Sequence, residues 1–223
     1  MATHEQRGFF ITLEGGEGSG KTSQINQLAA HLTEQGHKVV TTREPGGTPE
    51  AENIRDLLVQ RDGGDWSPVA EVLLIFAARI MHIQNVIQPA LDDGKIVICD
   101  RFTDSTLAYQ GYGHGLDIQK IKDVQTITIE DFAPDLTFIL DIDINIGLER
   151  SKKRLAADKG YEQTEDRFER LDSAFHERLR QGFLDIAAQD TARCHVEDAS
   201  QPIELVSEAI KRIALERIKD IKG

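Results

Sequence analysis

The segment at residues 15–22 constrains the fold more than any other part of the chain. It reads Gly-Gly-Glu-Gly-Ser-Gly-Lys-Thr and fits the pattern G-x-x-x-x-G-K-[ST] of a phosphate-binding loop. The segment follows an apolar run at residues 9–13 and opens a helical pattern at residues 22–35. A glycine-rich turn that arose by chance would need neither a strand before it nor a helix after it. The sequence therefore predicts a phosphate-binding loop between a first strand and a first helix.

The residue types of the loop indicate its chemistry. Glycines allow a tight backbone turn whose N–H groups point inward, and together with the following helix N-terminus they form a nest for the β- and γ-phosphates of a nucleotide. Lys21 adds a positive charge, and the Thr22 hydroxyl is placed to bind Mg²⁺. The residues expected to bind ATP are Gly15, Gly16, Glu17, Gly18, Ser19, Gly20, Lys21, Thr22 and Ser23.

Strand and helix patterns alternate along the chain. Short apolar runs, typical of strands buried on both faces, occur at residues 9–13, 39–42, 96–99, 136–140 and 192–196. Helical patterns lie at residues 22–35, 51–59, 70–91, 117–130, 144–157, 166–189 and 202–219. This order predicts an α/β protein with the three-layer P-loop NTPase fold, in which helices flank a five-stranded parallel sheet. We expect one domain over residues 1–223, with ligands at the carboxyl edge of the sheet.

The strand at residues 96–99 is followed by Asp100, at the edge where Mg²⁺ or its water would lie. Aspartate is also common at strand ends because it favours turns, so this position is informative only beside the phosphate-binding loop. We expect Thr22 and Asp100 to hold the metal.

The charge of the chain argues against some partners. The formal net charge is 26 − 38 = −12, so a lasting complex with polymeric nucleic acid or an anionic membrane would work against the overall field. The N-terminal segment lacks an apolar run after its charges, which indicates a cytoplasmic protein. Cys99 and Cys194 each lie in an apolar stretch and are expected to be buried.

The pattern at residues 70–91 is unusually apolar for a surface helix. One stripe at helical spacing consists of Phe76, Ile80, Ile83 and Ile87, and further apolar residues spread around the circumference. Such a helix is buried centrally or lies in a subunit interface. The charged segment at residues 151–166 contains a glycine and is predicted to form a mobile loop between helices.

Two further segments resemble the thymidylate kinases. Residues 42–48 read Thr-Arg-Glu-Pro-Gly-Gly-Thr, and residues 100–111 read Asp-Arg-Phe-Thr-Asp-Ser-Thr-Leu-Ala-Tyr-Gln-Gly. The similarity runs from the first strand to residues 198–202, and the order and spacing of the elements match as well. The resemblance implies an enzyme of dTTP synthesis that phosphorylates dTMP to dTDP by Mg-dependent, in-line transfer of the ATP γ-phosphoryl group. It also favours a homodimer.

The resemblance implies roles around the acceptor nucleotide. Arg101 is similar to the residue that grips the dTMP phosphate, for which a planar guanidinium is well suited, and Arg55 is similar to its helper. Glu17 matches an acidic position near the sugar 3′-hydroxyl and the metal, and Tyr109 is expected to wall the sugar. Pro45 matches a proline whose peptide bond is cis. Taken singly, such residues are more often solvated charges or packing aromatics.

The resemblance also implies how the base is read. Arg79 is similar to an arginine that donates to a thymine carbonyl, and Thr106 and Gln110 fall where the family hydrogen-bonds the pyrimidine. The family usually stacks thymine on a phenylalanine four residues before this arginine, but here that position is Ile75 and Phe76 follows it. One residue rotates a side chain by about 100° around a helix. We expect Ile75 to contact the base and Phe76 to lie in the core; the alternative is a locally shifted helix.

Phosphoryl transfer depends on positioning and electrostatics, and an arginine on the transferring group contributes roughly 10³ to 10⁵ in rate. The phosphate-binding loop contains no arginine. Residues 147–154 resemble the lid-arginine class of the family, and Arg150 and Arg154 lie four apart on one helical face. We expect Arg154 first and Arg150 second to act beside Lys21 and Arg101; the alternative is a solvated basic helix end.

Residues 166–169, Asp-Arg-Phe-Glu, resemble the sequence that follows such a lid, with Glu169 near the sugar and metal. Our hypothesis is that ATP binding closes residues 150–167 over the site and excludes water. Competing interpretations are a kinase of another nucleotide or of a deoxynucleoside, and a regulatory P-loop switch or ATPase. Against a GTPase, the sequence has no N-K-x-D or T-K-x-D guanine-reading segment.

Overall fold

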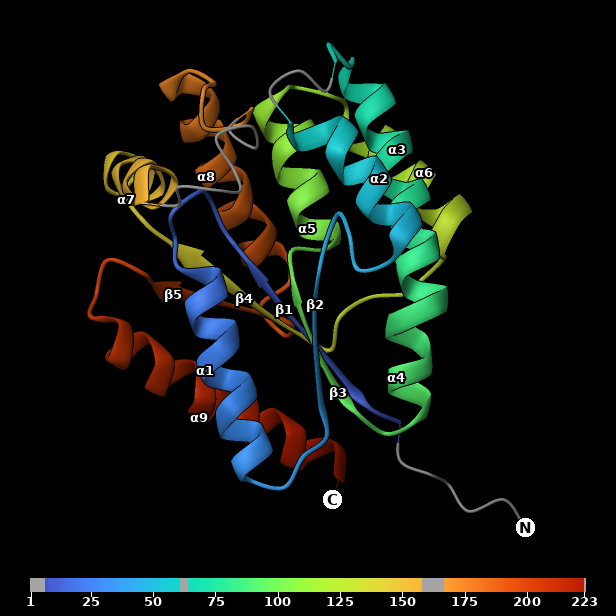
Figure 1. Cartoon of the computed structure of the whole chain (residues 1–223), viewed down its shortest axis with the longest axis vertical. Coiled ribbons are helices and arrows are strands. Elements are labelled where there is room, and N and C mark those ends of the chain that lie inside the picture. Colours follow the sequence, from blue (N-terminus) through green and yellow to red (C-terminus); the bar gives the residue numbers. More distant parts are fainter. Residues whose placement is uncertain (1–6, 61–63, 158–166, 223) are drawn as a thin grey trace.

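A parallel sheet forms the centre of the molecule (Figure 1). The computed structural model describes residues 7–60, 64–157 and 167–222, and the side chains of residues 154–157, 221 and 222 lie outside the described part. Among the described residues, five parallel strands are ordered β2 (Val39–Arg43), β3 (Ile96–Asp100), β1 (Phe9–Glu14), β4 (Leu136–Asp141) and β5 (Cys194–Asp198). This confirms the predicted α/β fold.

The register of the strands brings their carboxyl ends to one edge. Asp100 of β3 pairs with Leu13 of β1 on one side and with Arg43 of β2 on the other. Asp141 of β4 pairs with Asp198 of β5. Because all the strands are parallel, the loops that follow β1, β2 and β3 meet at this edge, which is where α/β proteins bind ligands.

The two faces of the sheet are covered by different helices (Figure 1). Side chains alternate along β1, so Phe9, Ile11 and Leu13 pack into one core cluster with α1 (Lys21–Glu34) and α9 (Ile203–Lys222). Phe10 faces the opposite side and packs with Phe76 in a second cluster. That second cluster includes residues of α3 (Pro68–His82) and α6 (Ile118–Ile129), and α2 (Pro49–Val59) packs beside α3.

A third core cluster lies next to the second. It contains Phe175 and Phe183 of α8 (Ser173–Gln189) together with Tyr109. The helix α7 (Ile144–Ala157) follows β4 and contacts α8. Cys99 and Cys194 are both buried, as expected. The three clusters fix the helices from which the site described below is built.

The helix predicted at residues 70–91 is not a single regular α-helix. α3 ends at His82, a π-helical segment η1 (Ile83–Ile87) follows, and a short α4 (Gln88–Asp92) completes the run. Pro89 has no backbone N–H, and in a regular α-helix its ring would clash with the carbonyl four residues earlier. The wider π-helical turn therefore lies where the regular hydrogen-bond pattern of the α-helix cannot continue. The continuous run Pro68–Asp92 is long and apolar enough to cross a membrane by composition alone, but 44% of the tested window is buried inside the fold.

Two other helix predictions need correction. The helix predicted from residue 166 begins at Ser173, where the Asp172 carboxylate accepts a hydrogen bond from the Phe175 backbone N–H at 2.7 Å and so caps the helix. The start at Asp166 lies outside the described residues. The segment after β3 was not predicted to be helical, yet it forms α5 (Thr103–Thr106) and the π-helical η2 (Leu107–Gly113). A π-turn lacks the 3.6-residue period on which helix prediction rests.

Candidate active site

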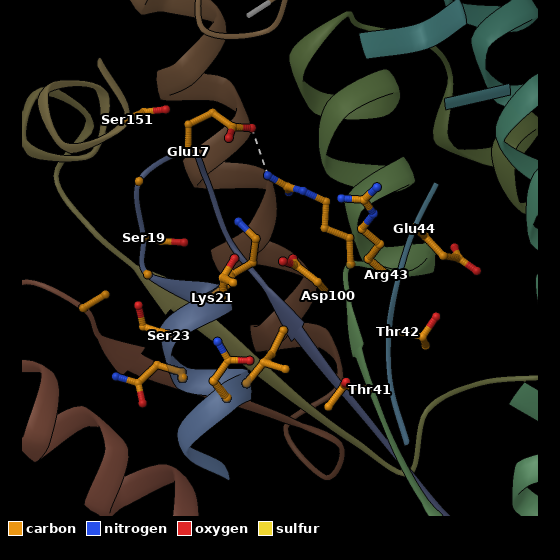
Figure 2. Close-up of a pocket in the computed structure, with 18 of the residues that line it drawn as sticks. Glu17, Ser19, Lys21, Ser23, Thr41, Thr42, Arg43, Glu44, Asp100 and Ser151 are labelled. Carbon is orange, nitrogen blue, oxygen red and sulfur yellow. Dashed lines mark hydrogen bonds and ion pairs between the residues drawn. The ribbon is translucent and has the colours of Figure 1, made fainter. Parts of the chain in front are cut away.

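The phosphate-binding loop joins β1 to α1 and borders a cleft of about 1130 Å³. Figure 2 shows Lys21 and Asp100 directed toward the same part of this cleft. At Gly18 the backbone has a φ of +67°, and a Cβ there would lie 2.0 Å from the Gly147 carbonyl oxygen in α7. Only glycine fits at this position, because the loop passes so close to α7.

Lys21 is the first residue of α1 and is buried. Its ammonium group donates to the carbonyl oxygens of Gly15 and Gly16 at 3.1 and 3.2 Å. Burial lowers the pKa of Lys21, and so does the nearby Arg101 charge, while neighbouring carboxylates raise it. An anion in the cleft would reverse part of this shift, so the geometry of Lys21 suits a phosphate ligand.

Asp100 ends β3 and lines the same cleft. Its Oδ1 atom is buried and has no hydrogen-bond partner among the described residues. A buried carboxylate oxygen without a donor suits a cation or its bound water. Among the described residues, no group of three or more His, Cys, Asp or Glu side chains could hold a metal alone. A metal here would have further ligands, such as water and nucleotide phosphate oxygens, which Mg²⁺ commonly has in proteins.

Arg101 stands beside Asp100 and is tightly constrained. Its backbone is left-handed, with φ at +67°. One guanidinium nitrogen donates to the Gly15 carbonyl at 3.0 Å and to the Ser105 hydroxyl at 3.2 Å, and another donates to the Glu17 carboxylate at 2.9 Å. Burial works to lower the pKa of Arg101, but Tyr109, Glu17 and other acidic neighbours outweigh it and raise the pKa. Arg101 is thus a fixed cation between the cleft and a second pocket.

Glu14 lies behind Arg101 and shares the Ser105 hydroxyl with it, a role that no sequence motif indicates. It is the last residue of β1 and is fully buried. Its carboxylate accepts from the Phe102 backbone N–H at 2.7 Å and from the Ser105 hydroxyl at 2.5 Å. Burial and the nearby Asp104 charge raise the pKa of Glu14 to about 7, although its two donors work in the opposite direction.

A second, smaller pocket of about 150 Å³ adjoins the cleft. Arg79 of α3 lies at its wall, 2% exposed, with its guanidinium 4.7 Å from the Phe76 ring centroid and 4.9 Å from the Phe102 ring centroid. Its Nε donates to Glu44 at 2.7 Å and its Nη2 to the Thr106 hydroxyl at 3.1 Å. The Nη1 atom is buried without an acceptor among the described residues. One donor therefore remains for a ligand.

Gln110 of η2 lines the same pocket and is 1% exposed. Its amide nitrogen donates to Glu71 of α3 at 2.8 Å. Its Oε1 atom is buried and has no donor among the described residues. The sequence analysis missed Glu71. A signal was available, because Glu71 is an acidic residue in a largely apolar helical pattern and lies four residues before Ile75 and eight before Arg79, on the same face.

The structure brings the other expected substrate residues to this pocket. Its lining includes Pro45, Arg55 and Ile75. The Glu44-Pro45 peptide is cis, which confirms that prediction. Arg55 of α2 donates to the Pro45 carbonyl at 3.1 Å. Phe76 is 1% exposed in the second core cluster, whereas Ile75 borders the pocket.

An aromatic and acidic group closes the pocket toward the phosphate-binding loop. The Tyr109 hydroxyl donates to Glu17 at 2.6 Å, and the Tyr109 ring meets the Phe168 ring edge-on with centroids 5.2 Å apart. Glu169 lines the pocket and accepts from the Ser151 hydroxyl of α7 at 3.2 Å. Tyr109, Glu17 and Glu169 therefore lie together, as the sequence analysis anticipated.

The expected lid is described only in part. Arg150 of α7 borders the large cleft and donates to the Ala199 carbonyl at 3.0 Å. The backbone of Arg154 continues α7, but its side chain lies outside the described part, as do residues 158–166. The lid hypothesis for residues 150–167 stays a prediction.

Comparison with known proteins places this geometry in a family. The profile of the thymidylate kinases matches residues 13–210. A thymidylate kinase of Syntrophotalea carbinolica is 49% identical over 202 residues, which cover 91% of this chain and 93% of that protein. One from Caulobacter vibrioides is 46% identical over 212 residues, covering 95% and 98%. The crystal structure of thymidylate kinase from Ehrlichia chaffeensis has a TM-score of 0.73 at 38% identity and covers 94% of this chain and 99% of its own.

Proposed function

Because the chain belongs to the thymidylate kinase family and phosphorylates dTMP to dTDP with ATP, we propose that two buried groups in the smaller pocket select the thymine base. The observation that carries this proposal is a complementary pair of unused atoms, the Nη1 donor of Arg79 and the Oε1 acceptor of Gln110. Thymine offers an O4 acceptor beside an N3–H donor. Cytosine reverses both groups and would leave each protein atom unmatched.

The remaining contacts of the pocket support a fixed base reader. Arg79 cannot turn easily, because Glu44 and Thr106 hold two of its nitrogens and two phenylalanine rings flank it. Ile75 supplies an apolar wall beside it. We assign the base edge to Arg79, Thr106 and Gln110 and the base face to Ile75.

The nucleotide sugar and acceptor phosphate belong between the two pockets. Arg101 lines both pockets, and we assign it to the dTMP phosphate with Arg55 as its helper. Tyr109, Glu17, Pro45 and Glu169 surround the sugar in this arrangement. The acceptor phosphate is already an anion, so the transfer needs no general base, and the chain's task is alignment of two anionic groups.

The larger cleft takes ATP. We assign the phosphate-binding loop from Gly15 to Ser23 to the β- and γ-phosphates. Its residues from Glu17 to Ser23 line the cleft, and Lys21 adds charge there. Thr22 and Asp100 would hold Mg²⁺, which would neutralise part of the negative charge of the phosphates. The orphaned Oδ1 atom of Asp100 supports this assignment. Arg154 and Arg150 of α7 would approach the transferring group from the lid side, and residues 150–167 would close over it.

The proposal extends to assembly and location. Exposed apolar side chains on α2, α3 and α6 support a homodimer; they are Leu57, Val69, Leu73 and Ile127. We also propose that the partners are monomeric nucleotides, that the protein is cytoplasmic, and that residues 1–223 form a single domain. Light scattering checks the dimer, which would be refuted by a monomer mass near 25 kDa at all concentrations.

The test of base selection is a coupled assay of ADP release with Mg·ATP and each nucleoside monophosphate in turn. We expect the highest rate with dTMP, a lower rate with dUMP, which lacks the methyl group, and little with dCMP, AMP, CMP or GMP. Equal rates with dTMP and dCMP would refute the assigned roles of Arg79 and Gln110. ADP release without any acceptor would instead indicate a hydrolase with the same phosphate-binding loop.

A further inference from the structure

Glu71 is a buried carboxylate whose two oxygens are both engaged. It lies on α3, is 1% exposed, and lines the base pocket. Its Oε2 accepts from the amide nitrogen of Gln110 at 2.8 Å, and its Oε1 accepts a short hydrogen bond from Arg167.

The orientation of the Gln110 amide depends on this contact. The two ends of a glutamine amide have nearly the same shape, but one donates and the other accepts. A carboxylate only accepts, so Glu71 draws the amide nitrogen toward itself and leaves Oε1 as the end without a protein partner. If the amide were turned, the NH₂ group would face the base and would suit the bare N3 of cytosine.

We propose that Glu71 is a positioning residue that determines which end of the Gln110 amide meets the base, and thereby determines selectivity for thymine over cytosine. This inference rests on the proposed reading of the base by Gln110.

Arg167 strengthens the arrangement from the other side. It donates from one nitrogen to Glu71 and from another to the Leu58 carbonyl at 2.9 Å, and its guanidinium lies 5.4 Å from the Phe168 ring centroid. The carboxylate of Glu71 is therefore held in place at both oxygens. The other base reader is separate, because Arg79 is held by Glu44 and Thr106. A change at Glu71 consequently tests Gln110 while leaving the contacts of Arg79 in place.

The test uses dTMP and 5-methyl-dCMP, two ligands that differ only at N3 and at position 4 of the ring. Their dissociation constants are measured by calorimetry at pH 8 for the wild type and for Glu71→Gln. The variant side chain has nearly the same shape but can donate or accept, so both amide orientations of Gln110 become available. We expect the preference for dTMP to fall roughly tenfold, because the mismatch at N3 is relieved while the mismatch at position 4 remains. The KM for ATP should not change.

A second variant controls for Arg167, whose guanidinium loses its carboxylate partner in Glu71→Gln. Glu71→Gln with Arg167→Gln removes both charges and should show the same loss of preference. Gln110→Ala is measured in parallel, because it removes the base reader itself. If both Glu71 variants kept the wild-type preference while Gln110→Ala lowered it, the role of Glu71 would be wrong and the base reading by Gln110 would stand. If Gln110→Ala also kept the preference, the proposed base reading would fail, and the role of Glu71 with it.

Discussion

The phosphate cleft and the base pocket are built in different ways. One wall of the cleft of about 1130 Å³ is a continuous loop with the helix that follows it, and a loop of this kind binds phosphate largely through backbone N–H groups. The base pocket of about 150 Å³ is lined by side chains from α2, α3, η2 and the segment after β2. The three side chains on which its selectivity depends, Arg79, Gln110 and Glu71, are each more than nine-tenths buried.

This difference has a physical origin. Every ATP carries the same phosphates, and a loop of backbone amides recognises them wherever glycine permits the turn. A base edge is recognised by donors and acceptors in a fixed order, which requires side chains held by other buried side chains. The phosphate cleft should therefore be sensitive to loss of charge, and the base pocket to loss of orientation.

The largest effect is expected from the arginines of α7. Replacing Arg150 and Arg154 together by alanine should lower kcat by roughly 10³ to 10⁵, because these two arginines are the ones assigned to the transferring group from the lid side. The affinity for dTMP should stay unchanged, since neither residue is assigned to the base pocket. Steady-state kinetics and dTMP calorimetry measure the two quantities.

Lys153→Ala is the matched control for these arginines. Lys153 lies on the same helix between them, is 75% exposed, and pairs with Glu149. Lys153 does not line the cleft, so its replacement removes a positive charge from α7 without removing a group that reaches the site. The kcat of this variant should stay close to that of the wild type. A double arginine variant that kept kcat within tenfold of this control would place the transition-state charge elsewhere.

Sequence reasoning found the phosphate cleft more completely than the base pocket. The loop at residues 15–22 is contiguous, and the strand predicted at residues 9–13 lies within β1 because its apolar run is unbroken. The pair Gln110 and Glu71 is separated by 39 positions, so only the tertiary fold brings the two side chains together. The π-turn in η2 carries Tyr109 and Gln110 and has no 3.6-residue pattern to reveal it. Buried supports such as Glu14 are likewise invisible to a motif.

A second prediction concerns Glu14, which joins the two regions through Phe102 and Ser105. Burial raises the pKa of Glu14 from its usual value of 4.5 to about 7. Between these values the unfolded chain releases the proton while the folded chain keeps it, so the free energy of unfolding falls as pH rises through this range. The shift corresponds to about 3 kcal/mol.

Glu14→Gln removes this dependence because its side chain has no proton to lose. Urea unfolding at pH 5, 6, 7 and 8 should show the variant gaining stability relative to the wild type as pH rises, with most of the change complete by pH 8. Glu52→Gln is the control: burial alone would raise the pKa of Glu52, but the Gly47 amide and Arg43 outweigh it and lower the pKa. That residue titrates below 4.5, so its variant should keep a constant offset from pH 5 to pH 8. A constant offset for Glu14→Gln as well would contradict the raised pKa.

The smallest effect is expected at Ile75, which we propose contacts the base by packing alone. Ile75 is half-buried at the wall of the base pocket. Truncation to alanine removes methylene groups from a partly covered surface, which corresponds to about 1 kcal/mol and roughly a fivefold increase in the KM for dTMP. Leu205→Ala is the control, because Leu205 is 57% exposed on α9 and lines neither pocket. An unchanged KM for dTMP in Ile75→Ala would mean that another group covers the base face. If instead the KM rises while the preference for dTMP over 5-methyl-dCMP is kept, packing at Ile75 sets the affinity and the Gln110 amide sets the selectivity.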